Sequence, residues 1–235
     1  MLNQNFSSFL KFGNHTILLK YMLMGAIGFG IGGFFPFNLY PDVSDYFPTL
    51  NEIVIFGAIG GIFMGILSKN IKKIIYLALI GSVGFSIGFI ISFLLLLNLF
   101  IIFIVRCLVG IRINGTDILP ESFASSIVLP IAFFICFMLG GLIMGMFYGI
   151  ALRNKRAIKI LSIAGGFGFA FAGSIVYIIT NMIYGISDMP LLFGVGGTSA
   201  YIIFGIIAGI FLGTGMYFAE KPSVSKSPRF RKEGG

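Results

Sequence analysis

Charged residues are scarce in this chain, and their scarcity excludes most soluble folds. Only 10% of its 235 residues are charged, whereas 57% are hydrophobic and the mean hydropathy is +1.03. In a typical soluble domain about a quarter of the residues are charged. The composition therefore predicts a protein that lies within a membrane.

Ionisable side chains are missing from the central part of every long apolar run. Proton relays, sodium coupling and voltage sensing depend on such groups inside the membrane, so ion-coupled transport is disfavoured. The one histidine, His15, lies in the amino-terminal segment. A Ser-His or metal-His site therefore cannot form within the membrane, and we expect no enzyme, no metal site and no cofactor.

The cysteines and the one nucleotide-like motif give no support to a cofactor site either. Cys107 and Cys136 lie far apart, without a CxxC pair or a histidine partner, and are interpreted as small hydrophobic residues. The letters GFGIGG at residues 28–33 match GxGxxG. The match lies inside an apolar run and not between a strand and a helix, so no nucleotide site is predicted there.

Long apolar runs are what the chain has in abundance. About 20 residues of helix cross the ~30 Å hydrocarbon layer of a bilayer. Six runs are interpreted as such spans, at residues 18–38, 52–68, 74–98, 126–151, 157–183 and 192–218. The sequence thus predicts an all-α polytopic membrane protein with six transmembrane helices in residues 18–218. Residues 1–17 form an amino-terminal segment and residues 219–235 a basic tail.

The few charges are divided unequally between the two sides of these predicted helices. One side carries 14 Lys and Arg against two acids, a net +12, and the other carries two Arg against six acids, a net −4, which together give the formal charge of +8. By the positive-inside rule, the first side is cytoplasmic and so are both termini. The basic balance therefore indicates orientation in the cell membrane, and no binding to nucleic acid is expected.

The third run and the loop after it depart from a plain span. Residues 74–105 would form a helix of about 48 Å, longer than a bilayer requires even at a tilt of about 40°. We expect this helix either to break near Asn98 or to project outside the membrane. In the loop that follows, Thr116 or Asp117 is placed to cap a short helix at the interface.

Two glycine patterns alternate along the chain, which indicates an internal repeat. The second, fourth and sixth runs contain GGIFMG, GGLIMG and AGIFLG. The first, third and fifth contain GAIGFGIG, GSVGFSIG and GGFGFAFA. The patterns predict one helical hairpin written three times, at about 18–68, 74–151 and 157–218. Because all three hairpins enter from the same side, they would be parallel repeats in a pseudo-threefold bundle.

Glycines four residues apart fall on one helix face and form flat strips. Such strips let two helix backbones approach closely in lipid, and we expect the strips of odd and even runs to meet. Alternatively, the strips line a narrow pore. The candidate packing or pore-lining residues are Gly57, Gly61, Gly65, Gly141, Gly145, Gly205, Gly209 and Gly213 in the even runs, and Gly28, Gly32, Gly84, Gly88 and Gly168 in the odd runs.

Other candidate site residues are few. Phe29, Phe85 and Phe169 occupy matching places in the odd runs, where three rings around an axis would form an apolar constriction. A candidate polar site lies toward the outward side and consists of Asn98, Arg106, Arg112 and Asn181. Its two arginines share a mixed-charge loop with Asp117 and Glu121, interpreted either as a solvated surface or as a vestibule or docking site.

These patterns leave two main functions open. In the first, the three hairpins surround a path, and the protein is a channel or facilitator for a small neutral solute without ion coupling. In the second, it is a non-catalytic membrane-embedded subunit or scaffold of a larger complex, packing through glycine-rich helix faces. An enzyme acting on lipid at the interface has the least support. The expected partners are the lipid bilayer and either a second copy of the chain or another membrane subunit.

Overall fold

Six helices make up nearly all of the part of the chain that the structure describes. The computed structural model describes residues 12–39, 50–110, 112–113, 116–117, 129–184 and 197–221. The helices are α2 (Phe12–Leu39), α3 (Leu50–Ile66), α4 (Ile71–Gly110), α6 (Leu129–Ala151), α7 (Lys155–Tyr184) and α8 (Gly197–Glu220). Two strands of two residues each, β1 (Arg112–Ile113) and β2 (Thr116–Asp117), pair antiparallel. The prediction of an all-helical protein with one helix at each apolar run is confirmed.

Five of these helices, α2, α4, α6, α7 and α8, are long and apolar enough to cross a membrane. The remaining helix, α3, is apolar but has 17 residues, about 25 Å of helix. Large apolar side chains face outward around the helices, with Leu79 at 61%, Ile163 at 57% and Ile131 at 53% exposure. Such a surface matches lipid and not water. The chain is therefore a membrane-embedded, multi-pass protein.

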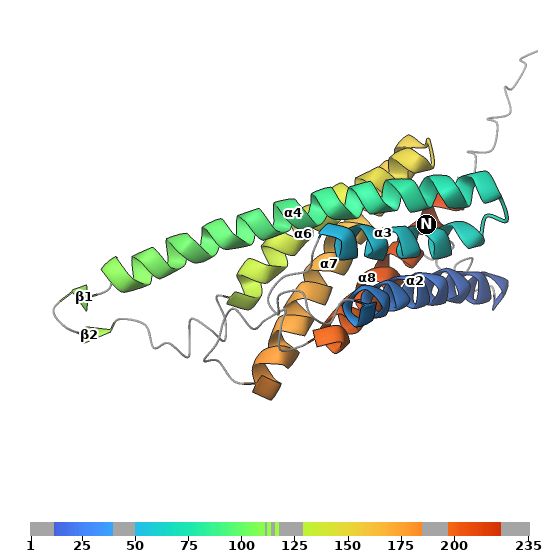
Figure 1. Cartoon of the computed structure of the whole chain (residues 1–235). Coiled ribbons are helices and arrows are strands. Elements are labelled where there is room, and N and C mark those ends of the chain that lie inside the picture. The colour runs from blue at the N-terminus through green and yellow to red at the C-terminus, as the bar shows by residue number, and fades with distance from the viewer. Residues whose placement is uncertain are drawn as a thin grey trace, which may run out of the picture.

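The helices form a closed ring in which each helix packs against two neighbours. The order around the ring is α2, α3, α4, α6, α7 and α8, and α8 packs against α2 to close it (Figure 1). Buried side chains from all six helices meet inside the ring in one cluster. The first and last of the described helices are thus direct neighbours, although they are far apart in the sequence.

At four of the six contacts in the ring, glycine faces glycine. Between α3 and α4, a Cβ at Gly57 would lie 2.5 Å from the carbonyl oxygen of Gly81, and one at Gly81 would lie 2.6 Å from that of Gly57. The same reciprocal contact joins α6 to α7, α8 to α2 and α4 to α6, through the pairs Gly141 with Gly165, Gly209 with Gly25 and Gly88 with Gly140. No side chain fits between these backbones, so only glycine allows the helices to approach so closely.

At three contacts, one of which also has a glycine pair, a phenylalanine lies over a glycine. The pairs are Gly28 with Phe63 between α2 and α3, Gly84 with Phe147 between α4 and α6, and Gly168 with Phe211 between α7 and α8. A Cβ at Gly84 would lie 2.7 Å from the Cβ of Phe147. Glycine strips of odd and even helices therefore meet at four contacts of the ring, and the α4–α6 contact combines a glycine pair with a phenylalanine that lies over a glycine.

Helix α4 runs unbroken past Asn98, where a break was one of the two expectations. It has 40 residues, about 60 Å, and extends well past its neighbours in Figure 1. Asn98 does not interrupt the helix, because its amide donates a hydrogen bond of 2.7 Å to the carbonyl oxygen of Leu94, one turn earlier. Of the two alternatives, projection beyond the other helices is the correct one.

Several other expectations concern residues at the edges of the described ranges. Thr116 and Asp117 form β2, and the short helix expected after them falls outside the described residues. Helix α2 begins at Phe12, earlier than the start expected at residue 18, while residues 192–196 of the sixth run lie outside the described part. The tail is described only up to residue 221.

The variant Gly61→Ala tests the close approach of α3 and α4. Its Cβ would overlap the carbonyl group of Leu77 and lie 2.8 Å from the Cα of Ala78, so no side chain can move to make room. We expect a loss of about 1–3 kcal/mol or more in the free energy of unfolding, measured by circular dichroism during thermal unfolding in detergent.

Gly30→Ala is the matched control. Its Cβ would meet the side chain of Ile206 at 3.0 Å, and that side chain can shift. We expect a clearly smaller loss than for Gly61→Ala. Equal losses in the two variants would contradict a backbone contact at Gly61.

Candidate functional site

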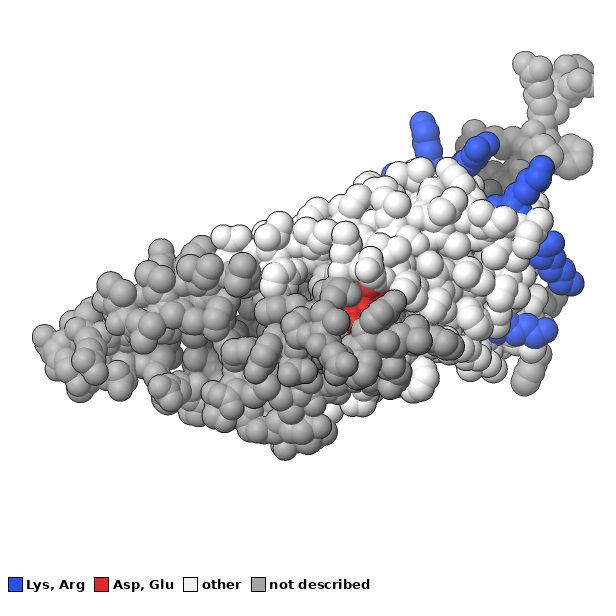
Figure 2. All heavy atoms as spheres, in the orientation of Figure 1, with Lys and Arg blue, Asp and Glu red and all other residues white. Residues whose placement is uncertain are grey.

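Lys and Arg side chains gather at one end of the ring, called the basic end from here on (Figure 2). This end is formed by the α3–α4 turn, the α6–α7 turn and the last residues of α8. The basic residues of these segments are Lys69, Lys72, Lys73, Arg153, Lys155, Arg156, Lys159 and Lys221. Glu220, the last residue of α8, is the acid placed among them.

The two turns at the basic end have the same local construction. Lys69 and Arg153 adopt positive φ angles of 51° and 53°, a conformation that terminates helices. Asn70 and Asn154 follow them, and each side-chain oxygen accepts a hydrogen bond from the backbone N–H two residues on, at 3.0 Å and 2.9 Å. These amino-terminal caps fix where α4 and α7 begin.

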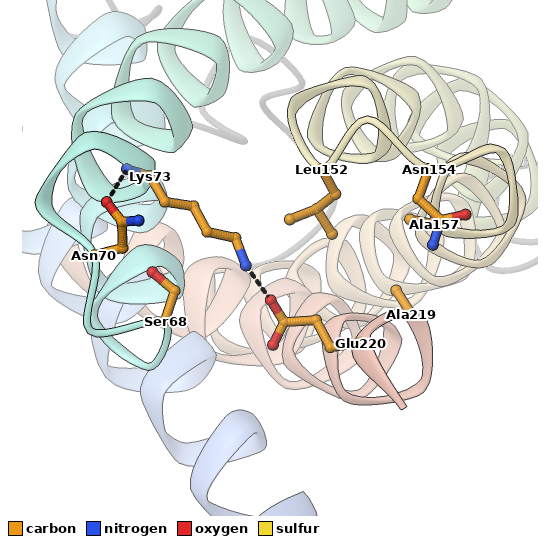
Figure 3. Close-up of a pocket in the computed structure, with 8 residues that line it drawn as sticks. All are labelled: Ser68, Asn70, Lys73, Leu152, Asn154, Ala157, Ala219 and Glu220. Carbon is orange, nitrogen blue, oxygen red and sulfur yellow. Dashed lines mark hydrogen bonds and ion pairs between the residues drawn. The ribbon is translucent and has the colours of Figure 1, made fainter. Parts of the chain in front are cut away.

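A hollow of about 580 Å³ opens at the basic end (Figure 3). Its walls come from the two turns and from the end of α8, which surround the centre of the ring, so the hollow lies over that centre. The residues that line it are Ser68, Asn70, Lys73, Leu152, Asn154, Ala157, Ala219 and Glu220.

Glu220 ties three helices together beside the hollow. Its carboxylate forms an ion pair with the Nζ of Lys73 on α4 and accepts a hydrogen bond from the hydroxyl of Tyr21 on α2. The side chains of Lys73 and Glu220 are 30% and 25% exposed, so water reaches both charges although part of their hydration is lost. Each charge therefore depends on the other, because removing one would leave its partner partly buried and uncompensated.

Aromatic side chains fill the middle of the ring. The rings of Phe56 and Phe85 stack with centroids 4.4 Å apart, and Phe169 lies 5.6 Å from Phe85 and 5.2 Å from Phe204. Phe29 lies 5.7 Å from Phe56. None of these five side chains is more than 5% exposed. The three phenylalanines at matching places in the odd runs thus lie in one aromatic layer, which closes the centre of the ring.

One hydroxyl group lies in this apolar centre without a partner. Tyr148 is fully buried, and its ring centroid lies 6.4 Å from that of Phe29. Among the described residues, its Oη is the buried side-chain polar atom that has no hydrogen-bond partner. Gly81 makes room for it, since a Cβ there would lie 2.5 Å from this oxygen. An unpaired buried hydroxyl costs about 1–3 kcal/mol, so its retention requires an explanation.

The end of the ring opposite the basic end holds a buried carboxylate, that of Glu52. The charge of this residue predicts a place on the outward side. Glu52 lies in the first turn of α3 and is only 5% exposed. It shares the buried face of α3 with Phe56, Gly60 and Met64, at intervals of four residues. That spacing is the signal in the sequence that would have placed Glu52 inside the ring. Polar groups thus lie at both ends of the ring, with an aromatic layer between them.

The candidate glycines all lie at contacts between helices. For each of the 13 residues in that set, an atom of a neighbouring helix lies within 3.0 Å of the place where a Cβ would be. These glycines form the walls of the ring, whereas large side chains occupy its centre.

The candidate polar site is not assembled within the described side chains. Asn98 is bonded to its own helix. Arg106 and Asn181 lie in α4 and α7 and Arg112 lies in β1, but their side chains are outside the described part of the structure.

The structure instead brings together polar side chains that sequence reasoning missed. Tyr21, Lys73 and Glu220 meet at the basic end from three different helices. No spacing along the chain connects these positions. The one signal in the sequence is an acid within the otherwise basic segments.

Comparison with known proteins gives no further assignment. No protein-family model, no curated protein and no solved structure matches this chain.

Tyr148→Phe tests whether the buried hydroxyl is unpaired. The variant keeps the ring and removes only the oxygen, so we expect stability to be unchanged or raised by about 1–3 kcal/mol. Thermal unfolding in detergent measures the change.

Tyr21→Phe is the matched control, because it removes a hydroxyl that donates to Glu220. We expect a loss of about 1–2 kcal/mol for this partly buried hydrogen bond to a charged group. A Tyr148→Phe protein that loses as much stability as the control would show that the Tyr148 hydroxyl has a partner.

Proposed function

We propose that the protein is a channel or facilitator that moves a small neutral solute through the centre of its helix ring, without ion coupling. The observation that carries this proposal is the hydroxyl of Tyr148, fully buried at the centre and without a hydrogen-bond partner among the described residues. A core that serves only stability gains nothing from such a group. A polar solute passing the centre would satisfy it.

The distribution of polar groups along the ring supports the same proposal. A polar hollow with Lys73 and Glu220 lies at the basic end, and Glu52 is buried toward the other end. Between them lies the aromatic layer, which closes the centre in this conformation. Passage of a solute therefore requires the phenylalanine rings to turn aside, as in pores that are gated by an apolar constriction.

We infer further that the three hairpins are parallel repeats around this centre. The glycine pairs at the α3–α4, α6–α7 and α8–α2 contacts support this arrangement, and so do the three contacts of a phenylalanine with a glycine. Helix α3 would be the sixth crossing, because it packs between α2 and α4 in the ring. Its 17 residues need only modest local thinning of the bilayer.

The filled centre favours a second candidate, a non-catalytic membrane-embedded subunit or scaffold. In that case the ring would be a rigid body that holds other chains or a second copy of itself. The candidate glycines are occupied by contacts within the chain. A partner would therefore pack on the outward apolar faces, for example along Ile75, Leu79 and Val83 of α4, which are 55%, 61% and 50% exposed.

We also propose that the ring lies in the cell membrane with its basic end and both chain termini in the cytoplasm. In a chain without its two native cysteines, Lys69→Cys places a thiol at the basic end and Asn98→Cys places one on α4 near the other end. A membrane-impermeant maleimide added to intact cells should label only Asn98→Cys, and Lys69→Cys only after the cells are opened. Labelling of Lys69→Cys in intact cells would contradict this orientation.

Osmotic swelling of vesicles that contain the purified protein tests the channel proposal. We expect the protein to raise permeability to small neutral solutes such as urea and glycerol. Phe85→Ala should raise it further by at least several fold, because the variant removes one ring of the aromatic layer. Phe167→Ala removes a ring that is 45% exposed on the outside and should leave permeability unchanged.

The outcome also separates the two candidate functions. If both the natural protein and a folded Phe85→Ala protein are no more permeable than empty vesicles, the channel proposal is wrong and the scaffold remains. An equal rise in Phe85→Ala and Phe167→Ala would mean leakage around the protein and would also contradict the proposal.

A further inference from the structure

The hollow at the basic end presents two opposite charges side by side. Lys73 reaches into it from α4 and Glu220 from α8, and their charged groups meet across its mouth (Figure 3). We propose that this hollow is a binding site for a small zwitterion, such as an amino acid, whose carboxylate takes the place of Glu220 at Lys73 and whose ammonium takes the place of Lys73 at Glu220. As a choice of substrate class, this inference rests on the proposed function.

The partial burial of the ion pair determines which ligand can replace it. The two side chains are 30% and 25% exposed, so a ligand can reach them from solution. A simple anion bound to Lys73 would leave Glu220 partly buried without its counter-charge, and a simple cation would do the same to Lys73. A zwitterion compensates both charges at once. It is also neutral overall, so it needs no coupled ion.

The surroundings of the two charges determine the orientation in which the zwitterion would bind. Helices α4 and α7 begin at the hollow, at Asn70 and Asn154, and the positive ends of their dipoles favour a carboxylate near Lys73. On the other side, the hydroxyl of Tyr21 donates to Glu220 and holds that carboxylate in place. The flexible Lys73 side chain can then swing from Glu220 to the ligand.

The size of the hollow suits such a ligand. Its volume of about 580 Å³ lies within the range of about 300–1,000 Å³ that is usual for sites of small molecules. Ser68 adds a hydroxyl to the wall, while Leu152, Ala157 and Ala219 supply apolar surface. A small side chain on the ligand would rest against that apolar surface.

Calorimetric titration of the purified full-length protein in detergent tests this inference with four probes of similar size. L-alanine carries both charges, propionate and ethylammonium carry one each, and propionamide carries none. We expect saturable binding of L-alanine and at least about tenfold weaker binding of each other probe. Binding of propionate, ethylammonium or propionamide as tight as that of L-alanine, or no binding of L-alanine, would overturn the inference.

Variants of the two charged residues test whether L-alanine binds in the hollow. Lys73→Met and Glu220→Gln should each weaken L-alanine binding at least about tenfold. Lys72→Met is the matched control, because this neighbouring lysine is exposed and does not line the hollow, and it should bind as the natural protein does. If Lys72→Met loses as much affinity as Lys73→Met, the site lies elsewhere.

The double variant Lys73→Glu with Glu220→Lys is a control for the case in which the single variants lose binding because they do not fold. It restores an ion pair between the same helices with the charges exchanged, so it should fold and still bind L-alanine, but more weakly than the natural protein, because Tyr21 and the helix ends favour the native direction. A folded double variant that does not bind L-alanine would contradict the site.

Binding and transport test the two proposals separately. Binding of L-alanine without any solute flux would support the site and reject the channel. Flux of neutral solutes without preferential binding of L-alanine would support the channel and reject the zwitterion site.

Discussion

The structure depends on one contact, in which the bare backbones of two helices press together in lipid. Apolar side chains gain nothing by leaving lipid for one another, so helix association relies on close packing and weak Cα–H···O contacts. At Gly57 and Gly81, each backbone occupies the space where the other residue would carry a side chain. Because the same contact joins α6 to α7 and α8 to α2, it closes the ring that all other features of the structure require.

The tight walls determine what lies inside. Beside the glycine pairs, rings such as Phe63 pack over glycines, and the inward faces of the helices carry phenylalanines that meet in one layer. Charged side chains lie at the two ends of the ring, where Glu220 binds Lys73 and Tyr21 at the basic end. Tyr148 places a hydroxyl without a hydrogen-bond partner within the apolar centre.

Sequence reasoning predicted those features that depend on neighbouring residues. The apolar runs became helices because length and composition are local properties, and the basic turns end α3 and α6 with the same positive φ at Lys69 and Arg153. It could not decide whether α4 would break at Asn98, since that depends on a hydrogen bond to its own helix. It assigned Glu52 to the outward side by its charge and did not predict that the side chain is buried, although a four-residue spacing connects it to Phe56 on the buried face of α3. The charge was given more weight than the helical period.

By itself, the sequence determined that this is a multi-pass helical membrane protein with its basic residues concentrated at one end, and it marked the glycines at which helices would touch. The partners of these glycines were decided by the tertiary structure, which set α8 against α2 and so brought Tyr21 and Lys73 to Glu220. The tertiary structure also filled the centre with aromatic rings instead of leaving it open. The physical reason is that composition and helical period act within a single helix, whereas the closure of a ring depends on how six helices fit together.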